Sequence, residues 1–216
     1  MDTVKQFEMS LGKKERRVFS SLSSSTKIQA FLDQISYCDD DIYRSPLNLL
    51  RDKKACCLDS ALFAATALRR LGHPPLIVEL IAANDDDHII AIYKRNGLFG
   101  AIAKSNFVGL RFREPIYRSL RELIMSYFEF YYNLHGEKTL RSYSVPLNLK
   151  AFDKINWMMS DDNLETIAQQ LDKIRKISLL TPRMIHSLSP VDRRTYEAGM
   201  LGADTDAIYK PRKKSS

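Results

Sequence analysis

The sequence predicts an α+β protein in which N-terminal helices and one largely buried helix pack on a small antiparallel sheet. The buried helix is predicted because apolar residues recur behind Cys57 at three-and-four spacing, at Ala61, Ala64, Ala65 and Leu68. The sheet is predicted because apolar runs typical of strands lie on both sides of Asn96-Gly97, the strongest short hairpin signal. A C-terminal helical extension completes the predicted fold.

The composition is that of one soluble domain. The 216 residues can bury a core, and 44% apolar with 27% charged residues is typical of globular proteins. The formal charge of +7 is spread out and accompanies no nucleic-acid motif, so we interpret it as a solvated surface. No apolar run approaches the roughly 18 residues of a membrane span. The chain begins without a signal-peptide pattern, and three cysteines, two of them adjacent, favour a reducing compartment, so we expect a cytoplasmic protein.

The helices before Cys57 follow from their start signals. Residues 1–25 form a polar, serine-rich lead-in. Ser25 or Thr26 can cap the helix that begins the predicted core. Ser45-Pro46 then begins a short helix that leads directly to the Cys57 helix.

The middle of the chain alternates between strand and helix signals. Apolar runs predict three strands, at 76–81, 88–93 and 98–107. Pro115 is expected to begin a long helix that ends near Asn133, with aromatic residues on its buried side. The core is therefore placed at 26–135.

The last third of the chain is predicted to be helical. Residues 136–209 are expected to form an extension packed on the core, where Asp161 or Asp162 can cap one helix. Ser189-Pro190 can begin another short helix. Residues 210–216 are basic, and we expect a disordered tail there.

Cys57 is the candidate nucleophile. It lies at the N-terminus of the predicted helix, where free backbone N–H groups stabilise an anion and bias a thiol toward thiolate. The same groups could hold an oxyanion. The alternatives are that Cys56 is the nucleophile, or that the cysteine is only a small buried hydrophobic residue.

His88 is the candidate base. A nucleophilic cysteine needs a base within hydrogen-bond reach, and that base needs a third group to hold its tautomer. Among the four histidines, His88 alone begins a predicted core strand. Along the chain, the helix that begins with the cysteine is followed by a strand, by the strand that begins with the histidine, and by a strand with polar residues. This order supports a catalytic pair.

The hairpin register names two candidates for the third group. With a two-residue loop at Asn96-Gly97, His88 faces Ser105 on the neighbouring strand. A shift of one residue would bring Asn106 or Lys104 opposite instead. Asn106 offers the better acceptor for an imidazole N–H, and Ser105 fits the register better. Both are kept as candidates.

No cofactor and no metal site is predicted. A site of Cys56, Cys57 and His88 is disfavoured because adjacent cysteines are unusual in tetrahedral zinc sites and no C-x-x-C pair occurs. The acidic triple at 85–87 lacks the alternating oxygen ligands of a calcium loop, so we interpret it as a solvated turn.

These residues resemble the transglutaminase-like superfamily, a branch of the papain-like cysteine enzymes. The resemblance covers about 26–110. It rests on Cys57, Asp59 and Ala61 at alternate positions, on His88 opening a strand, and on the segment 97–106. It implies a papain-like α+β core and a catalytic triad of cysteine, histidine and an acid. The chain departs from this pattern where the acid is expected, because that segment offers only Ala103, Lys104, Ser105 and Asn106.

The sequence therefore predicts a cysteine-dependent acyl-transfer enzyme. Cys57 would attack an amide or ester carbonyl to form a thioester, His88 would act as base and then as acid, and Ser105 or Asn106 would hold the ring. Water as acceptor gives a hydrolase, either a peptidase or an amidase, and an amine gives an amide-forming acyltransferase. We expect a peptide-like or small amide or ester substrate, and neither nucleic acid nor membrane as partner. The alternative is a non-catalytic transglutaminase-like binding module that has lost the acidic triad member.

Overall fold

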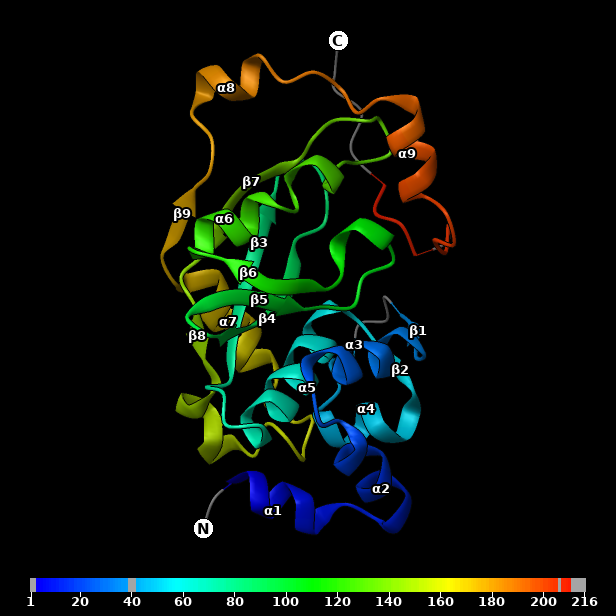
Figure 1. Cartoon of the computed structure of the whole chain (residues 1–216), viewed down its shortest axis with the longest axis vertical. Helices are drawn as coiled ribbons and strands as arrows, with labels where there is room; N and C mark the ends of the chain where they lie inside the picture. The colour runs from blue at the N-terminus through cyan, green and yellow to red at the C-terminus, as the bar shows by residue number, and fades with distance from the viewer. Residues whose placement is uncertain (1–2, 39–41, 206, 211–216) are drawn as a thin grey trace.

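The N-terminal helices lie together at one end of the molecule in the computed structural model, which describes residues 3–38, 42–205 and 207–210 (Figure 1). They are α1 (Thr3–Ser10), α2 (Lys13–Ser21), α3 (Ser25–Asp33), α4 (Pro46–Asp52) and α5 (Cys57–Arg70). Ser24 caps α3 and Ser45 caps α4 through their hydroxyl oxygens. Phe7 and Phe19 are buried in the same cluster as α5, so the polar lead-in contributes to the core.

The main sheet is antiparallel and has the strand order β6-β5-β4-β3-β7-β9, with β8 also beside β3. Its strands are β3 (Leu76–Ala82), β4 (His88–Arg95), β5 (Leu98–Ile102), β6 (Arg113–Tyr117), β7 (Leu140–Ser144), β8 (Leu147–Asn148) and β9 (Lys176–Ser178). A separate parallel pair, β1 (Ser36–Tyr37) with β2 (Lys54–Ala55), joins the chain before α4 to the chain before α5. The predicted α+β class with an antiparallel sheet is confirmed.

The hairpin between β4 and β5 has the predicted turn and the predicted register. Asn96 and Gly97 have φ of +53° and +80°, as this tight turn requires, and Arg95 pairs with Leu98. The pairing ends at Ala91 with Ile102, because the chain leaves the sheet after Ile102. The expected cross-strand pair of His88 and Ser105 therefore does not form.

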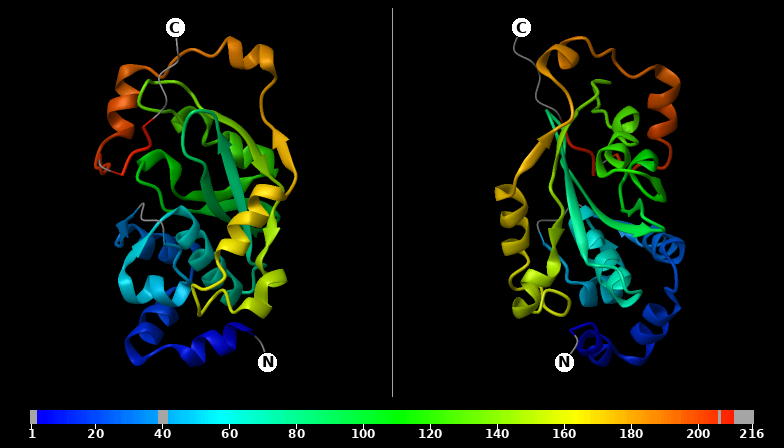
Figure 2. Two further views of the ribbon diagram at one scale, coloured as in Figure 1. Left: turned by 180° about the vertical axis from the view of Figure 1, so that it is seen from behind. Right: turned by 60° about the vertical axis from the view of Figure 1, so that its left-hand side comes forward.

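Side chains of β4 alternate between the two faces of the sheet. Ile89, Ala91 and Tyr93 join the cluster formed with α5 and α7 (Glu165–Lys173). Ile90 and Ile92 join the opposite cluster, which contains residues of α6 (Leu120–Met125). Figure 2 shows α6 and α7 on opposite faces of the sheet. The sheet is thus covered on both sides, which explains why β4 is an almost continuous apolar run.

The predicted long helix from Pro115 to Asn133 is wrong. Pro115 lies within β6, an edge strand of the sheet, where a residue without an N–H can be tolerated. The helix α6 begins only at Leu120, after the cap Ser119, and a short 3₁₀ turn, η2 (Phe128–Phe130), follows it. Tyr127, Phe128 and Tyr131 of this stretch are nevertheless buried, as expected, whereas Phe130 is 44% exposed.

The C-terminal part contains strands that the sequence did not indicate. It has the predicted helical character in η3 (Leu149–Ile155), α7, α8 (Pro182–His186) and α9 (Arg193–Gly199). However, β7, β8 and β9 extend the main sheet beyond β3. Asp161 accepts hydrogen bonds from the backbone N–H of Ser45 (2.7 Å) and from Asn48 Nδ2 (2.8 Å), so it ties this part to α4 instead of capping α7. The predicted tail at 210–216 falls, except for Lys210, outside the described residues.

Within the parts of the chain that the structure describes, no helix combines the length and the apolar character needed to cross a lipid bilayer.

The packing of α5 yields a stability prediction. Leu62 is fully buried at the middle of α5, so we expect Leu62→Ala to lower the free energy of unfolding by about 2–5 kcal/mol. Urea denaturation would measure the change. The matched control is Met9→Ala on α1, where the side chain is 67% exposed and the change should stay within about 0.5 kcal/mol. Equal losses in both variants would contradict the central place of α5 in the core.

Candidate active site

Cys57 is the first residue of α5, as the sequence predicted. Cys56 is the N-cap residue with extended backbone, and it forms a capping box with Asp59. In that box, Asp59 Oδ2 accepts a hydrogen bond from the Cys56 backbone N–H at 3.1 Å. The side chain of Cys57 is partly exposed, so the thiol lies at the positive end of the helix dipole with access to solvent.

Asp59 is fully buried and joins two segments of chain. Its Oδ1 accepts from the backbone N–H of Arg44 at 2.8 Å, and the Arg44 guanidinium lies 3.8 Å from Oδ2. Burial raises the pKa of Asp59 to about 6, although the hydrogen bonds from the backbone N–H groups of Arg44 and Cys56 oppose that rise. The acidic position in the motif therefore fixes the start of α5.

His88 opens β4 and is nearly fully buried, and its ring is held by a backbone carbonyl. Its Nε2 lies 2.9 Å from the carbonyl oxygen of Leu110. Because a carbonyl can only accept, Nε2 must carry the proton. This tautomer leaves Nδ1 for a second partner.

Cys57 and His88 interact directly. The pKa of the Cys57 thiol lies well below its usual value because Cys56 donates a hydrogen bond to the thiolate, and His88 adds a second hydrogen bond and its charge. The backbone N–H of Ile89 adds a further hydrogen bond, and these contributions outweigh burial. The pKa of Cys56 is raised, because it shares that hydrogen bond with Cys57 and is buried. Of the two adjacent cysteines, Cys57 is therefore the one biased toward thiolate, and Cys56 is its hydrogen-bond donor.

The contacts of Ser105 and Asn106 lead away from His88. Ser105 Oγ accepts from the backbone N–H of Phe107 at 3.0 Å. Asn106 binds the backbone of Asp204. Lys104, the third residue that a register shift could have brought there, donates from Nζ to two carbonyl oxygens at the end of α3. The position expected for the triad acid is occupied by the Leu110 carbonyl, which leaves no side-chain signature in a sequence.

Tyr43, Tyr131 and Asp87 lie near enough to the Cys57 thiol to interact with its charge. Burial raises the pKa values of Tyr43 and Tyr131, and negative charge on Cys57 contributes to both shifts. Tyr131 donates its hydroxyl hydrogen to the carbonyl of Asp86 at 2.6 Å, and Asp87 Oδ1 accepts from the backbone N–H of Ala82 at 2.8 Å. These two bonds fix the turn that delivers His88 to Cys57.

Among residues 3–38, 42–205 and 207–210, no group of three or more histidine, cysteine, aspartate or glutamate side chains is arranged to hold a metal ion. This includes the combination of Cys56, Cys57 and His88 considered from the sequence.

Comparisons with known proteins leave the family open. No protein-family model matches the chain, and no curated protein matches it. Among solved structures, Legionella pneumophila LapG is similar at 19% identity and a TM-score of 0.34, over 45% of this chain and 70% of LapG. EGTA-treated LapG from the same organism gives 19% identity and a TM-score of 0.34, over 46% and 68% of the two chains. At these values we draw no conclusion from LapG, so the molecule is defined as an α+β protein with a cysteine–histidine pair.

The burial of Asp59 yields a pH prediction. Its folded pKa is raised above the unfolded value of about 3.9, so its protonated form favours folding, and this stability is lost as pH rises through about 6. We expect the free energy of unfolding to fall by up to about 3 kcal/mol between about pH 4 and pH 6, relative to Asp59→Asn. Urea denaturation of both proteins across that range measures the difference. If the free energy of unfolding has the same pH dependence in both proteins, Arg44 offsets the buried charge of Asp59.

The geometry of His88 yields a second prediction. Since the Leu110 carbonyl holds the ring, we expect Ser105→Ala to leave the rate of Cys57 alkylation and its pH dependence unchanged. Mass spectrometry of iodoacetamide-treated protein measures both quantities at Cys57. A large loss of rate in this variant would restore Ser105 as the third member of the triad.

Proposed function

We propose that this protein is a cysteine-dependent acyl-transfer enzyme with a transglutaminase-like core. The observation that carries the proposal is the paired Cys57 and His88 at the start of a buried helix, with the pKa of the thiol lowered. A structural cysteine gains nothing from a histidine whose tautomer is fixed by a third group, whereas a nucleophile requires one.

The proposed reaction uses the Cys57 thiolate as nucleophile, the Cys57 backbone N–H as oxyanion donor, and His88 as acid and base. The Cys57 thiolate attacks the carbonyl carbon of an amide or ester, and the backbone N–H of Cys57 donates to the oxyanion that forms. The C–N or C–O bond then breaks while His88 gives the Nδ1 proton to the leaving amine or alcohol, and a thioester remains. Water or an amine attacks the thioester, His88 takes its proton, and Cys57 leaves as the thiolate.

The Leu110 carbonyl supports this cycle differently from an acid. It fixes the tautomer with Nε2 protonated, as the reaction requires. A wrong tautomer costs about 10⁴ in kcat in serine proteases, so the correct tautomer accounts for much of the role of a triad acid. A neutral carbonyl stabilises the imidazolium less than a carboxylate does, and we propose correspondingly slower chemistry.

The molecule that accepts the acyl group from the thioester decides between two forms of the proposed enzyme. With water the enzyme is a peptidase or an amidase, and with an amine it is an amide-forming acyltransferase. We propose a peptide-like or small amide or ester substrate and a reducing, cytoplasmic setting, which would keep Cys57 free.

The test is the pH dependence of iodoacetamide labelling at Cys57, compared with His88→Ala. We expect rapid labelling well below the unperturbed thiol pKa of about 8.5, and loss of that reactivity in the variant. Peptide mapping separates Cys57 from Cys38 and Cys56. The matched control is His135→Ala, because His135 is exposed and should not affect the rate.

If the Cys57 thiol has an ordinary pKa and His88→Ala does not change it, the proposal that this protein is an enzyme is overturned. The chain would then be better described by the alternative, a binding module that keeps the fold without the chemistry.

A further inference from the structure

Cys38 and Cys56 lie opposite each other at the end of the parallel pair that β1 forms with β2 (Figure 1). In this pair the backbone N–H of Ser36 donates to the carbonyl oxygen of Lys53 at 3.0 Å. The N–H of Cys38 repeats that bond two residues further along both strands, with the carbonyl oxygen of Ala55 at 3.3 Å. Cys56 is still extended, with φ of −83° and ψ of −175°. The ladder pattern therefore continues until Cys38 lies beside Cys56.

This spacing brings the two cysteines within reach of a disulfide. Neighbouring strands lie about 4.8 Å apart, and disulfide-bonded cysteines have Cα atoms about 4.4–6.8 Å apart. Opposite residues of a parallel pair also project to the same face, so both sulfurs lie on one side of the pair. Cys38 and Cys56 are both thiols in this structure.

Arg44 and Asp59 place the two sulfurs in one environment. Arg44 Nη1 donates to Cys38 Sγ at 3.4 Å and lies 3.8 Å from Asp59 Oδ2. Cys56 Sγ accepts from the backbone N–H of Asp59 in the capping box. The guanidinium stabilises negative charge on Cys38, whereas the charge of Asp59 opposes it on Cys56. Cys38 is therefore the sulfur better suited to attack an oxidant.

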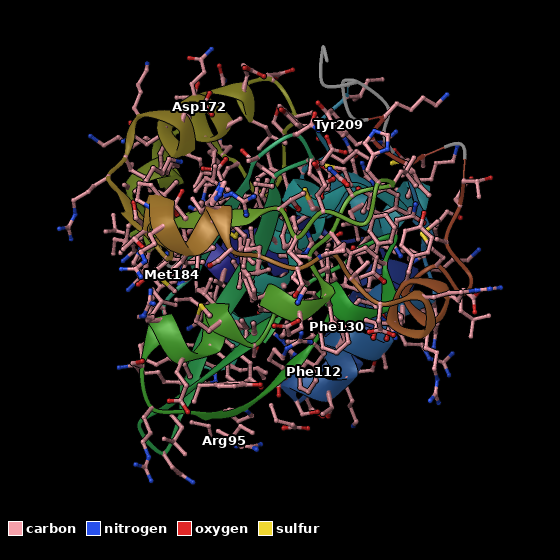
Figure 3. The ribbon with its side chains drawn as sticks, turned by 90° about the horizontal axis from the view of Figure 1, so that it is seen from above. Arg95, Phe112, Phe130, Asp172, Met184 and Tyr209 are labelled. Atoms are coloured by element: carbon pink, nitrogen blue, oxygen red, sulfur yellow. The ribbon has the colours of Figure 1, made fainter. Side chains whose placement is uncertain are left out.

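A small oxidant can reach the pair from solvent. Cys38 and Cys56 each keep part of their surface exposed. Burial raises the pKa of Tyr43 most, and charge on Cys56 and on Asp172 of α7 adds to the rise. Figure 3 shows Asp172 at the edge of the molecule, so the surroundings of Cys56 extend to the surface on the α7 side.

A disulfide at Cys56 would remove a hydrogen bond from Cys57. The S–H of Cys56 makes the largest contribution to the lowered pKa of the Cys57 thiol. A sulfur in a disulfide carries no hydrogen and cannot donate, so only His88 and the Ile89 N–H would remain as donors. Cys57 itself stays outside the disulfide, and reduction of the disulfide would restore its donor.

We propose that Cys38 and Cys56 form a reversible disulfide, and that this disulfide lowers the reactivity of Cys57. The site of oxidation is then separate from the nucleophile. The effect at Cys57 rests on the proposed function, whereas the disulfide itself does not. Reversible disulfides of this kind suit a reducing compartment, where protein disulfides are mostly transient.

The oxidant is a low-molecular-weight disulfide, such as glutathione disulfide. The Cys38 thiolate attacks one of its sulfurs, its S–S bond breaks, and one glutathione leaves as the thiolate. Cys56 then loses its proton to solvent and attacks the Cys38 sulfur of the mixed disulfide, and the second glutathione leaves. In total two protein thiols lose two electrons and two protons, and one glutathione disulfide gains them to become two glutathione molecules.

The experiment equilibrates the full chain in glutathione buffers that run from reduced to oxidised. Iodoacetamide marks the remaining thiols, and N-ethylmaleimide added after reduction marks the cysteines that were oxidised. Fragment masses assign each label to one residue, and the intact mass separates an internal disulfide from bound glutathione. The rate of Cys57 labelling is measured at about pH 6, below the unperturbed thiol pKa. Chains with glutathione on Cys57 are left out of that rate.

We expect oxidation to protect Cys38 and Cys56 together, without bound glutathione, and to slow the labelling of Cys57 about tenfold or more. This is the effect of losing one hydrogen bond to a charged group. Dithiothreitol should restore the rate. The matched control is Cys38→Ser, which keeps an acceptor for Arg44. Its labelling rate at Cys57 in reduced buffer should equal that of the unsubstituted chain, and oxidation should not slow it.

The outcomes separate the two proposals. If the reduced protein labels at Cys57 as an ordinary thiol, the proposed function fails, and the joint protection of Cys38 and Cys56 still decides the disulfide. If Cys57 is reactive but Cys38 and Cys56 are never joined, or if Cys56 is joined to Cys57, the enzyme stands and the disulfide is overturned. A disulfide that leaves the rate at Cys57 unchanged, or equal slowing in Cys38→Ser, overturns its effect on the nucleophile.

Discussion

The candidate site depends on one buried carboxylate. Asp59 receives the backbone N–H of Cys56 and that of Arg44, so it fixes the first turn of α5 and the approach of the chain before α4. A buried charge is tolerated only when hydrogen bonds replace its water, and here they come from the main chain of both segments. Cys57 is placed by this arrangement, because it lies between the two members of the capping box. The position of the thiol therefore follows from the hydrogen bonds that Asp59 accepts from the local backbone.

The partner of the thiol comes from the other layer of the molecule. His88 begins β4, and the next residue, Ile89, packs toward α5 while its N–H reaches the sulfur of Cys57. The pair consequently exists only while α5 is docked on the sheet. The hydrogen bond from Cys56 is the largest cause of the lowered pKa of the thiol, and the contacts with His88 and the Ile89 N–H, which require docking, lower that pKa further against the effect of burial.

The sequence predicted those parts of the molecule that local patterns determine. The helical period behind Cys57 and the Asn96-Gly97 turn gave α5 and the hairpin correctly. The helix predicted to begin at Pro115 is wrong because proline suits both a helix start and an edge strand, and only tertiary pairing decides between them. The strands β7 and β9 are short and polar, and they become strands through pairing with distant segments. The partner of His88 was missed because the register was extended past Ile102, where the chain leaves the sheet.

A main-chain oxygen in the third position changes what natural selection can act on. Every amino acid at position 110 supplies the same carbonyl, so tolerance to substitution there would say nothing about the importance of the atom. The shape of the segment is the sensitive property instead. At Gly109, an added Cβ would lie 2.5 Å from the Cβ of Phe130. Selection on the orientation of this histidine would therefore act on a neighbouring glycine and an aromatic ring, and not on an acidic side chain.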